Sequence, residues 1–329
     1  MKVPHRRQAG VWSKWWAAVL LLSSFACTAQ EYPSRAIRMI VPQAPGGGTD
    51  ILGRFLAQKL SELLRQPAVV ENRTGAGSIV GTEFVARSTA DGYTLMVGGI
   101  FNIVMNKALV KNLSHDPLRD FVPLGFTSAY PFLLLTRPDL PVSNLAEFAK
   151  YAAERPGKLT YGSAGIGTLQ HVWGAILFKS MGLDMLHVPF KGAAPAHQEM
   201  MAGRLDVLFD NLSASKQLVQ GGRLKGLAVS SANRSSHLPN VPTVNETGVV
   251  RFEGESWFGL FAPTGTPAAV VDVLRNAHAR IVREAEFVAR VESDGGRVLA
   301  VPPREQQQFM QSEIERWSAA VGRYGVTVD

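Results

Sequence analysis

Two glycine-rich turns at strand-to-helix junctions constrain the fold of this chain most strongly. They read Pro42-Gln-Ala-Pro-Gly-Gly-Gly-Thr-Asp50 and Tyr161-Gly-Ser-Ala-Gly-Ile-Gly-Thr-Leu-Gln-His171, and each lies between a short apolar run and a helical pattern. Glycine allows positive φ and close approach of the backbone, so several N–H groups can converge where the helix dipole places positive charge. Such a turn binds a carboxylate or phosphate without a charged side chain. Because the turns lie far apart in the chain, we expect them in two lobes that face one cleft.

Strand and helix patterns alternate along the chain, which predicts an α/β fold with a mostly parallel sheet flanked by helices in each lobe. The predicted strands span Ile37–Val41, Ala68–Glu71, Thr94–Gly98, Phe132–Thr136, Leu159–Gly162, Met185–Val188, Val207–Phe209 and Trp257–Ala262. The predicted helices span Asp50–Leu64, Ile79–Ser88, Asn144–Glu154, Leu169–Met181, Ala194–Met201, Pro267–Arg283 and Gln306–Tyr324.

The length also indicates two lobes, because 329 residues with 46% hydrophobic composition exceed what one core usually organises. We place lobe 1 at residues 30–130 plus 233–329 and lobe 2 at residues 131–232. The chain then crosses between the lobes near 128–136 and again near 228–262. Two crossings form a hinge, and hinged lobes close around ligands.

The N-terminus has the pattern of an export signal. Basic residues without any acidic one precede an apolar stretch from Trp15 to Ala26, and small residues surround Ala29. The apolar stretch is shorter than the ~20 residues that span a bilayer. We therefore predict that residues 1–29 are a cleaved signal peptide and that the protein is periplasmic. Lipoprotein anchoring at Cys27 is the alternative, which the residues before this cysteine fit less well.

The charge balance gives no sign of a nucleic-acid partner. Residues 1–29 carry four positive charges and no negative one, so their removal lowers the formal net charge from +7 to +3. No stripe of Lys and Arg interleaved with aromatic residues follows. Cys27 is the only cysteine of the chain. The mature sequence therefore excludes a disulfide, a thiol nucleophile and a thiolate metal site.

A series of short motifs occurs in an order that resembles one known family. The motifs are Tyr32-Pro33, Pro42-x-x-Pro-Gly-Gly-x-x-Asp50, Val70-Glu-Asn-Arg-x-Gly-Ala-Gly77, Asp91-Gly-Tyr-Thr94, Tyr161-Gly-Ser-x-Gly-x-Gly-Thr168, Phe190-Lys-Gly-x-x-Pro195, Gly203-x-x-Asp206, Phe209-Asp-Asn211, Leu238-Pro-x-Val-Pro-Thr243, Trp257-Phe-Gly259 and Ala262-Pro263. From about Tyr32 to its end, the chain resembles the Bug family, also called the TctC family. Its members are periplasmic solute-binding proteins of tripartite tricarboxylate transport systems.

The resemblance implies a two-lobed periplasmic-binding-protein fold of type II, which closes like a Venus flytrap on a carboxylate. In this family the two glycine-rich turns grip the ligand through backbone amides, hydroxyls and ordered water. Matched to this chain, the implied ligand-binding residues are Pro45, Gly46, Gly47, Thr49 and Asp50 in the first turn, Ser163, Ala164, Gly165, Gly167 and Thr168 in the second, and Lys191, Gly192, Asp210 and Asn211 elsewhere in the ligand envelope.

Other chemistries fit these residues less well. Gln170 stands where a dinucleotide fingerprint has its third glycine, and Ser163 lacks the spacing of a nucleophile elbow. His187 and His197 lie on different elements, and no acidic cluster joins them. We therefore expect no catalytic residue, no metal and no cofactor.

Several of these residues also have a structural interpretation. Asp50 fits the N-cap of the helix that follows the first turn. His171 fits a bond to a neighbouring carbonyl better than a ligand contact, and Ser163 fits a hydroxyl donor to the ligand. Trp257 and Phe258 fit either a pocket wall or the hinge.

The sequence therefore predicts a non-catalytic receptor that captures a small carboxylate and passes it to membrane permease subunits. We expect it to act as a monomer. A sensing role with the same ligand site, a periplasmic hydrolase and a scaffold protein are the alternatives. Backbone donors recognise a carboxylate but not the body attached to it. Dicarboxylates, tricarboxylates, acidic amino acids and aromatic acids are all compatible with these turns.

Overall fold

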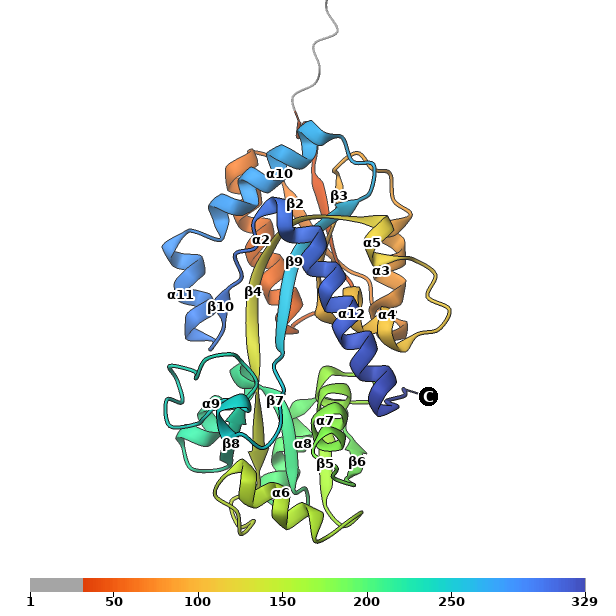
Figure 1. Ribbon diagram of the computed structural model, residues 1–329. Coiled ribbons are helices and arrows are strands. Elements are labelled where there is room, and N and C mark those ends of the chain that lie inside the picture. The colour runs from red at the N-terminus through yellow and green to blue at the C-terminus, as the bar shows by residue number, and fades with distance from the viewer. Residues whose placement is uncertain (1–31, 329) are drawn as a thin grey trace, which may run out of the picture. The chain divides into compact units, whose positions relative to one another are not determined.

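The computed structural model describes residues 32–328, and those from Arg35 onward form one compact unit. The predicted signal peptide, with Cys27, lies outside the described residues. In Figure 1 the early and late segments of this unit, coloured orange and blue, share its upper half, while the green and teal segments form its lower half. Among the described residues, no helix combines the length and the apolar character that a membrane span requires.

Within residues 32–328, ten strands form one sheet in the order β2-β1-β3-β9-β4-β7-β5-β6, with β8 and β10 also paired to β4. The strands are β1 Ile37–Val41, β2 Ala68–Asn72, β3 Thr94–Gly99, β4 Phe121–Thr136, β5 Thr160–Ser163, β6 Leu186–Pro189, β7 Val207–Asn211, β8 Lys225–Val229, β9 Glu255–Pro263 and β10 Arg297–Val298. All eight predicted strands are confirmed to within a few residues, except that β4 is much longer than predicted, and β8 and β10 were not predicted.

The sheet is parallel at its two ends and antiparallel in its middle. β1 pairs in parallel with β2 and β3, and β5 pairs in parallel with β6 and β7. The long strands β4 and β9 pair antiparallel with each other and with their other neighbours. The α/β class is confirmed, and the antiparallel middle is a feature that the simple alternation of strands and helices did not predict.

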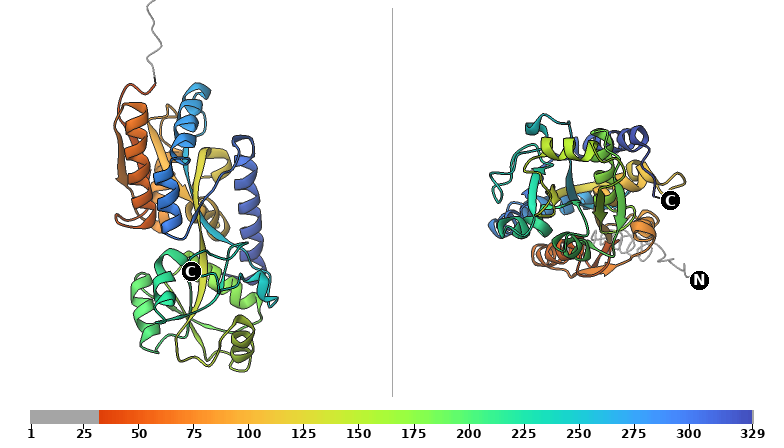
Figure 2. Two further views of the ribbon diagram at one scale, coloured as in Figure 1. Left: turned by 90° about the vertical axis from the view of Figure 1, so that its left-hand side faces the viewer. Right: turned by 90° about the horizontal axis from the view of Figure 1, so that it is seen from below.

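Strand β4 links the two halves of the sheet. Its first part, Phe121–Pro131, pairs with β9, and its last part, Phe132–Thr136, pairs with β7 and β8. Figures 1 and 2 show this strand and β9 running through the middle of the unit. The sequence predicted only the last part, because Pro123 and Pro131 are residues that interrupt strand patterns. The register of β4 with β9 shifts near Pro123, which is how the strand accommodates that proline.

Helices cover both faces of the sheet. They are α2 Gly48–Leu64, α3 Ile79–Ala86, α4 Asn106–Leu109, α5 Pro117–Asp120, α6 Leu145–Ala153, α7 Leu169–Ser180, α8 Ala193–Met201, α9 Leu212–Gln220, α10 Ala268–Ile281, α11 Ala285–Ser293 and α12 Gln306–Tyr324, with a π-helical turn η3 at Phe101–Met105 and 3-10 turns η2 Ala76–Ser78, η4 Asn245–Thr247 and η5 Pro303–Glu305. The seven predicted helices are confirmed. Figure 2 shows α2, in red-orange, and α12, in dark blue, on opposite sides of the sheet.

The terminal helix α12 braces the fold. Its buried side chains recur at helical spacing, and Gly325 ends it in the left-handed conformation at φ 55°. Trp317 stacks on Trp173 of α7 with ring centroids 4.8 Å apart, and Glu313 Oε2 accepts a hydrogen bond from Trp257 Nε1 of β9 at 3.0 Å. These contacts place the N-terminus of α7 close to the middle of the sheet, where the site lies.

Candidate functional site

A cavity of about 360 Å³ lies where the first turns of α2 and α7 meet the middle of the sheet. Its walls come from both halves of the sheet and from the turns that leave β1, β3, β5 and β7. The lining residues are Gln43, Gly48, Thr49, Gly99, Ile100, Phe101, Asn102, Phe132, Thr168, Leu169, Gln170, Asn211, Ser213, Ser256, Trp257 and Phe258. None of these described lining residues carries a charged side chain. The volume is in the range of small-molecule sites.

The first glycine-rich turn is held in shape by Asp50. Its Oδ2 accepts hydrogen bonds from Gly46 N at 2.9 Å and Arg54 Nε at 2.9 Å, and its Oδ1 accepts one from Asn72 Nδ2 at 2.8 Å. The pKa of this buried carboxyl is lowered to about 2, chiefly by the hydrogen bond from Arg54. Burial acts in the opposite direction, and the bonds from Gly46 and Asn72 lower the pKa further. Asp50 is therefore a permanently charged anchor of the turn at neutral pH.

The first turn of α2 offers open amide donors beside the cavity. Its N-cap is Gly47, in extended conformation and without a side-chain cap, which corrects the interpretation of Asp50 as N-cap. The first N–H that bonds back into the helix is that of Ile51, to Gly47 O at 3.0 Å. The N–H groups of Gly48, Thr49 and Asp50 have no acceptor among the described residues. The positive end of the helix dipole thus carries unsatisfied donors at the cavity wall.

The second glycine-rich turn is held by neutral groups. Ser163 is fully buried, and its Oγ donates to Gly165 O at 3.0 Å and accepts from Gly165 N at 3.2 Å. Thr168 Oγ1 donates to the same carbonyl at 2.7 Å and accepts from His171 N at 3.5 Å, so Thr168 is the N-cap of α7. Gly165 adopts φ +139°, a conformation that favours glycine.

Two stacked imidazoles support this second turn. The rings of His171 and His187 lie 4.0 Å apart, and Tyr161 stacks on the other side of His187. His187 Nε2 lies 2.8 Å from Ser163 Oγ, and Gly167 N donates to His171 Nδ1 at 3.1 Å. Burial lowers the pKa of His187 to about 4, with His171 adding to the effect, and burial also lowers the pKa of His171. Both imidazoles are therefore neutral at pH 7. His171 thus has a structural role, but its ring accepts from the Gly167 N–H instead of bonding the neighbouring carbonyl that the sequence analysis expected.

Asp210 orients a residue of the cavity wall. It is fully buried at the end of β7, where its Oδ1 accepts a hydrogen bond from Gln170 Nε2 at 3.1 Å and its Oδ2 lies 2.7 Å from His197 Nε2. Gln170 lines the cavity and keeps one amide N–H and its carbonyl oxygen for another partner. Next to Asp210, Asn211 Oδ1 accepts from Ser213 N at 3.0 Å and caps α9.

The structure brings only some of the residues implied by the resemblance to the cavity wall. Thr49, Thr168 and Asn211 line it, and Asp50, Ser163 and Asp210 lie behind it as buried anchors. The others lie on the turns outside the lining: Pro45, Gly46 and Gly47 are exposed on the first turn, Ala164, Gly165 and Gly167 are half-buried on the second, Gly192 N donates to Ala164 O at 3.1 Å, and Lys191 is exposed. Direct ligand contact by these residues stays a prediction.

The wall contains residues that the sequence did not indicate. Gly99 and the π-helical turn η3 supply backbone and side chains after β3, and Asn102 Oδ1 accepts from Gly99 N at 2.8 Å. Pi-helical turns are frequent at functional sites, but no turn signal in the sequence marks this one. Gln170 lies within the second glycine-rich turn, which is the only sequence signal that pointed to it. Trp257 and Phe258 of β9, which fitted a wall or a hinge, line the cavity.

A cleft between two halves of an α/β sheet, with helix N-termini at its wall, defines a two-lobed solute-binding protein. The family model "Tripartite tricarboxylate transporter family receptor" (TctC) matches residues 52–326. The chain therefore belongs to the TctC family, which confirms the resemblance seen in the motifs, and its fold is that of periplasmic binding proteins.

Known relatives cover nearly the whole chain. The protein BugT of Bordetella pertussis is 33% identical over 300 residues, which are 91% of this chain and 92% of BugT. The structure of R. palustris Rpa4515 with adipate has a TM-score of 0.80 at 33% identity and covers 90% of this chain and 99% of its own. MatC (Rpa3494) from Rhodopseudomonas palustris with bound malate has a TM-score of 0.77 at 32% identity and covers 88% and 100%.

Proposed function

We propose that this protein is a periplasmic receptor that binds a small carboxylate in the cavity between α2 and α7. The observation that carries the proposal is the uncapped first turn of α2 beside an uncharged cavity wall. The first turn of α7 supplies the opposite donors, because the N–H groups of Leu169 and Gln170 have no acceptor among the described residues. An anion is the ligand that such a pair of helix ends favours.

The energies are sufficient without a buried arginine. A hydrogen bond to a charged group contributes about 1.5–3 kcal/mol, and a helix N-terminus contributes up to ~2 kcal/mol in a partly buried site. Three or four such bonds support micromolar binding, which corresponds to ~8 kcal/mol, after association costs. Rpa4515 with adipate and MatC with malate support a carboxylate as the ligand class.

The residues implied by the resemblance take two roles in this proposal. The turns carrying Pro45, Gly46 and Gly47, and Ala164, Gly165 and Gly167, bring the helix ends to the ligand. Thr49, Thr168 and Asn211 line the cavity and reach the ligand directly, whereas Asp50, Ser163 and Asp210 fix the donors in place. Lys191 and Gly192 complete the outer rim.

Closure and delivery complete the proposed function. We infer that residues 30–130 plus 233–329 and residues 131–232 form two lobes, with crossings near 128–136 and 228–262, so that the cavity lies between them. Closing the hinge buries the ligand, and reopening releases it to permease subunits of a tripartite tricarboxylate transporter. Binding by neutral donors suits this release. A sensing role uses the same site and differs only in the partner that recognises the closed form.

A hydrolase is the second candidate, because His187 Nε2 lies 2.8 Å from Ser163 Oγ. Three observations weigh against it. Ser163 is fully buried and outside the cavity lining, its hydroxyl bonds within the turn, and burial lowers the pKa of His187 to about 4, too low for an effective base at neutral pH. Turnover of a carboxylic ester that disappears on Ser163→Ala would restore this candidate.

Gly48→Pro tests the proposed binding mode by removing a single backbone N–H donor. Proline suits the first helical position, and Gly47 before it is already extended, with φ −76° and ψ 165°. The substitution therefore removes one N–H donor and preserves the helix. Gly48→Ala is the matched control, because a Cβ at this position meets nothing within 4 Å and the N–H stays.

The measurement is isothermal titration calorimetry with malate and adipate, after denaturation and refolding have removed any copurified ligand. We expect Gly48→Pro to weaken binding roughly 10- to 100-fold relative to Gly48→Ala, as for loss of one hydrogen bond to a charged group. Equal affinities of the two variants would exclude the α2 terminus as the carboxylate site.

A further inference from the structure

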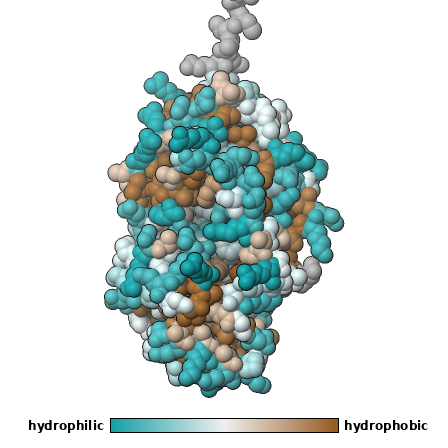
Figure 3. Space-filling view, in the orientation of Figure 1, coloured by the Kyte–Doolittle hydropathy of each residue, from teal (hydrophilic) through white to brown (hydrophobic). Residues whose placement is uncertain are grey.

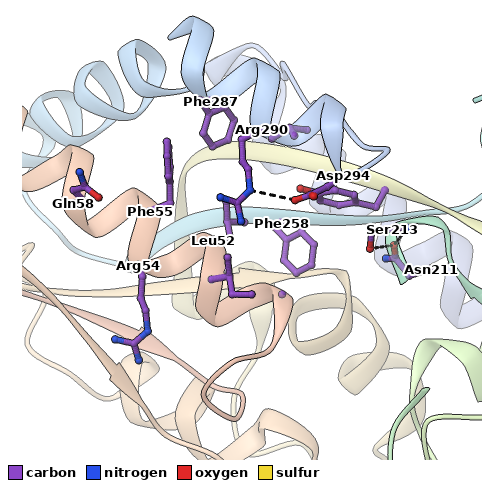
Figure 4. Close-up of a pocket in the computed structure, with 14 residues that line it drawn as sticks. Leu52, Arg54, Phe55, Gln58, Asn211, Ser213, Phe258, Phe287, Arg290 and Asp294 are labelled. Carbon is purple, nitrogen blue, oxygen red and sulfur yellow. Dashed lines mark hydrogen bonds and ion pairs between the residues drawn. The ribbon is translucent and has the colours of Figure 1, made fainter. Parts of the chain in front are cut away.

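A second cavity, of about 540 Å³, lies between α2 and α11. It adjoins the cavity between α2 and α7 that we propose binds the carboxylate. The two cavities share four wall residues, namely Gly48, Asn211, Ser213 and Phe258. Figure 4 shows this second cavity, with Phe55 and Phe287 at one end, Phe258 in the middle and Asn211 with Ser213 at the other end. A ligand held at the α2 terminus can therefore extend along this wall.

The second cavity is largely aromatic. Phe55 of α2 and Phe287 of α11 have ring centroids 5.8 Å apart, and Tyr130 of β4 meets Phe258 of β9 edge-on at 6.0 Å. Leu52 and Val291 also line it. In Figure 3, hydrophobic residues gather on the part of the molecular surface where α2 and α11 lie in Figure 1. Aromatic side chains contribute a large apolar area and prefer edge-on or offset contacts with another ring.

The charged side chains that line this cavity, Arg54, Arg290 and Asp294, each have a partner. Arg290 Nε lies 3.5 Å from Asp294 Oδ2, and Arg54 Nε donates to Asp50 Oδ2 at 2.9 Å. Asp294 would repel a second carboxylate of the ligand that approached Arg290. With these charges partnered, the aromatic wall favours an uncharged, apolar ligand body.

We propose that this cavity is a subsite for the aromatic body of the ligand, an inference that rests on the proposed function. The preferred ligand class is then an aryl-substituted monocarboxylate. The acid group binds at the first turn of α2, and the ring enters between Phe55, Phe258 and Phe287. Gly48 leaves room for a ligand to extend from one cavity into the other, because it lies on the wall of both cavities and has no side chain.

The test compares 3-phenylpropanoate with propanoate, which differ only by the ring, by isothermal titration calorimetry on the refolded protein. We expect 3-phenylpropanoate to bind roughly 10- to 100-fold more tightly, as for burial of one aromatic ring. Leu52→Trp fills the cavity from a half-buried position and should reduce this preference to less than about threefold while leaving malate affinity unchanged.

Phe55→Ala is the second variant, and it should lower the preference for the ring by truncating one wall. Its matched control is Phe84→Ala, which removes an equally half-buried phenylalanine that packs under Arg73, outside both cavities.

Equal binding of the two probes to the wild type, or equal loss of both on Leu52→Trp, overturns the subsite. If malate or adipate binds while 3-phenylpropanoate does not, the subsite is wrong and the proposed function stands. If no carboxylate binds at all, both are wrong.

Discussion

The two glycine-rich turns present helix ends to the same cavity, yet they are anchored by different chemistry. In the first turn a charged group, Asp50, ties Gly46, Arg54 and Asn72 together, and the helix end stays uncapped. In the second turn Ser163 and neutral imidazoles carry the anchoring, and Thr168 caps the helix. We infer that the first turn of α2, with its open amide donors, is the main anion site, and that the shape of the second turn depends on neutral histidines.

Loss of Asp50 is the change that should separate the turns most strongly. Asp50→Ala leaves Gly46 N and Asn72 Nδ2 without their acceptor, and we expect it to lower the free energy of unfolding by about 2–3 kcal/mol. Ser163→Ala removes neutral bonds only and should cost about 1–2 kcal/mol. Urea unfolding measures both. The exposed residue Ser312 provides a control, since Ser312→Ala should change stability by less than about 0.5 kcal/mol. Equal losses at the two turns would contradict the difference in anchoring.

Acid should affect the second turn before the first. The pKa of His187 is lowered from 6.5 to about 4, so the unfolded chain takes up this proton first, and the stabilising contribution is complete above pH 6.5 and lost as pH falls toward about 4. The pKa of Asp50 is lowered from 3.8 to about 2, so its contribution is lost only below pH 3.8. The free energy of unfolding, measured by urea unfolding from pH 7 to 4, should therefore fall, and His187→Gln should flatten that fall. An unchanged pH profile in this variant would show that the imidazole does not support the turn.

The smallest expected effect is at the cap of α7. Thr168→Val removes the hydroxyl that accepts from His171 N and donates to Gly165 O, and it should lower stability by about 0.5–1 kcal/mol. Thr168→Ser keeps the hydroxyl and is the matched control. Thermal unfolding compares the two, and a Val variant as stable as the Ser variant would mean that the second helix end needs no cap.

The alternation of strands and helices was sufficient to predict the fold class, because each periodic segment carries its own signal. It was insufficient for β4, where Pro123 and Pro131 interrupt the pattern while long-range pairing with β9 maintains the strand. It also missed α11, which begins at Ala285 shortly after α10 ends at Ile281, without a glycine or proline between them. Tertiary packing decides both segments, and no local pattern records it.

The sequence predicted the parts of the site that local residue patterns define, but not the parts that depend on which distant segments pack together. The glycines located both turns, and the helix ends follow from them. The sequence could not show that Ser163 is buried and bonded within its turn, that Asn102 and Gln170 reach the same cavity, or which of its two possible roles Phe258 takes. Those positions depend on which segments the sheet brings together.

A crystal structure of the protein loaded with malate or 3-phenylpropanoate would show directly whether the acid group binds at the helix ends. We expect a carboxylate oxygen within about 2.7–3.2 Å of the backbone nitrogens in the first turn of α2, with the first turn of α7 on its other side. An acid group bound elsewhere, with both helix ends facing solvent, would contradict it.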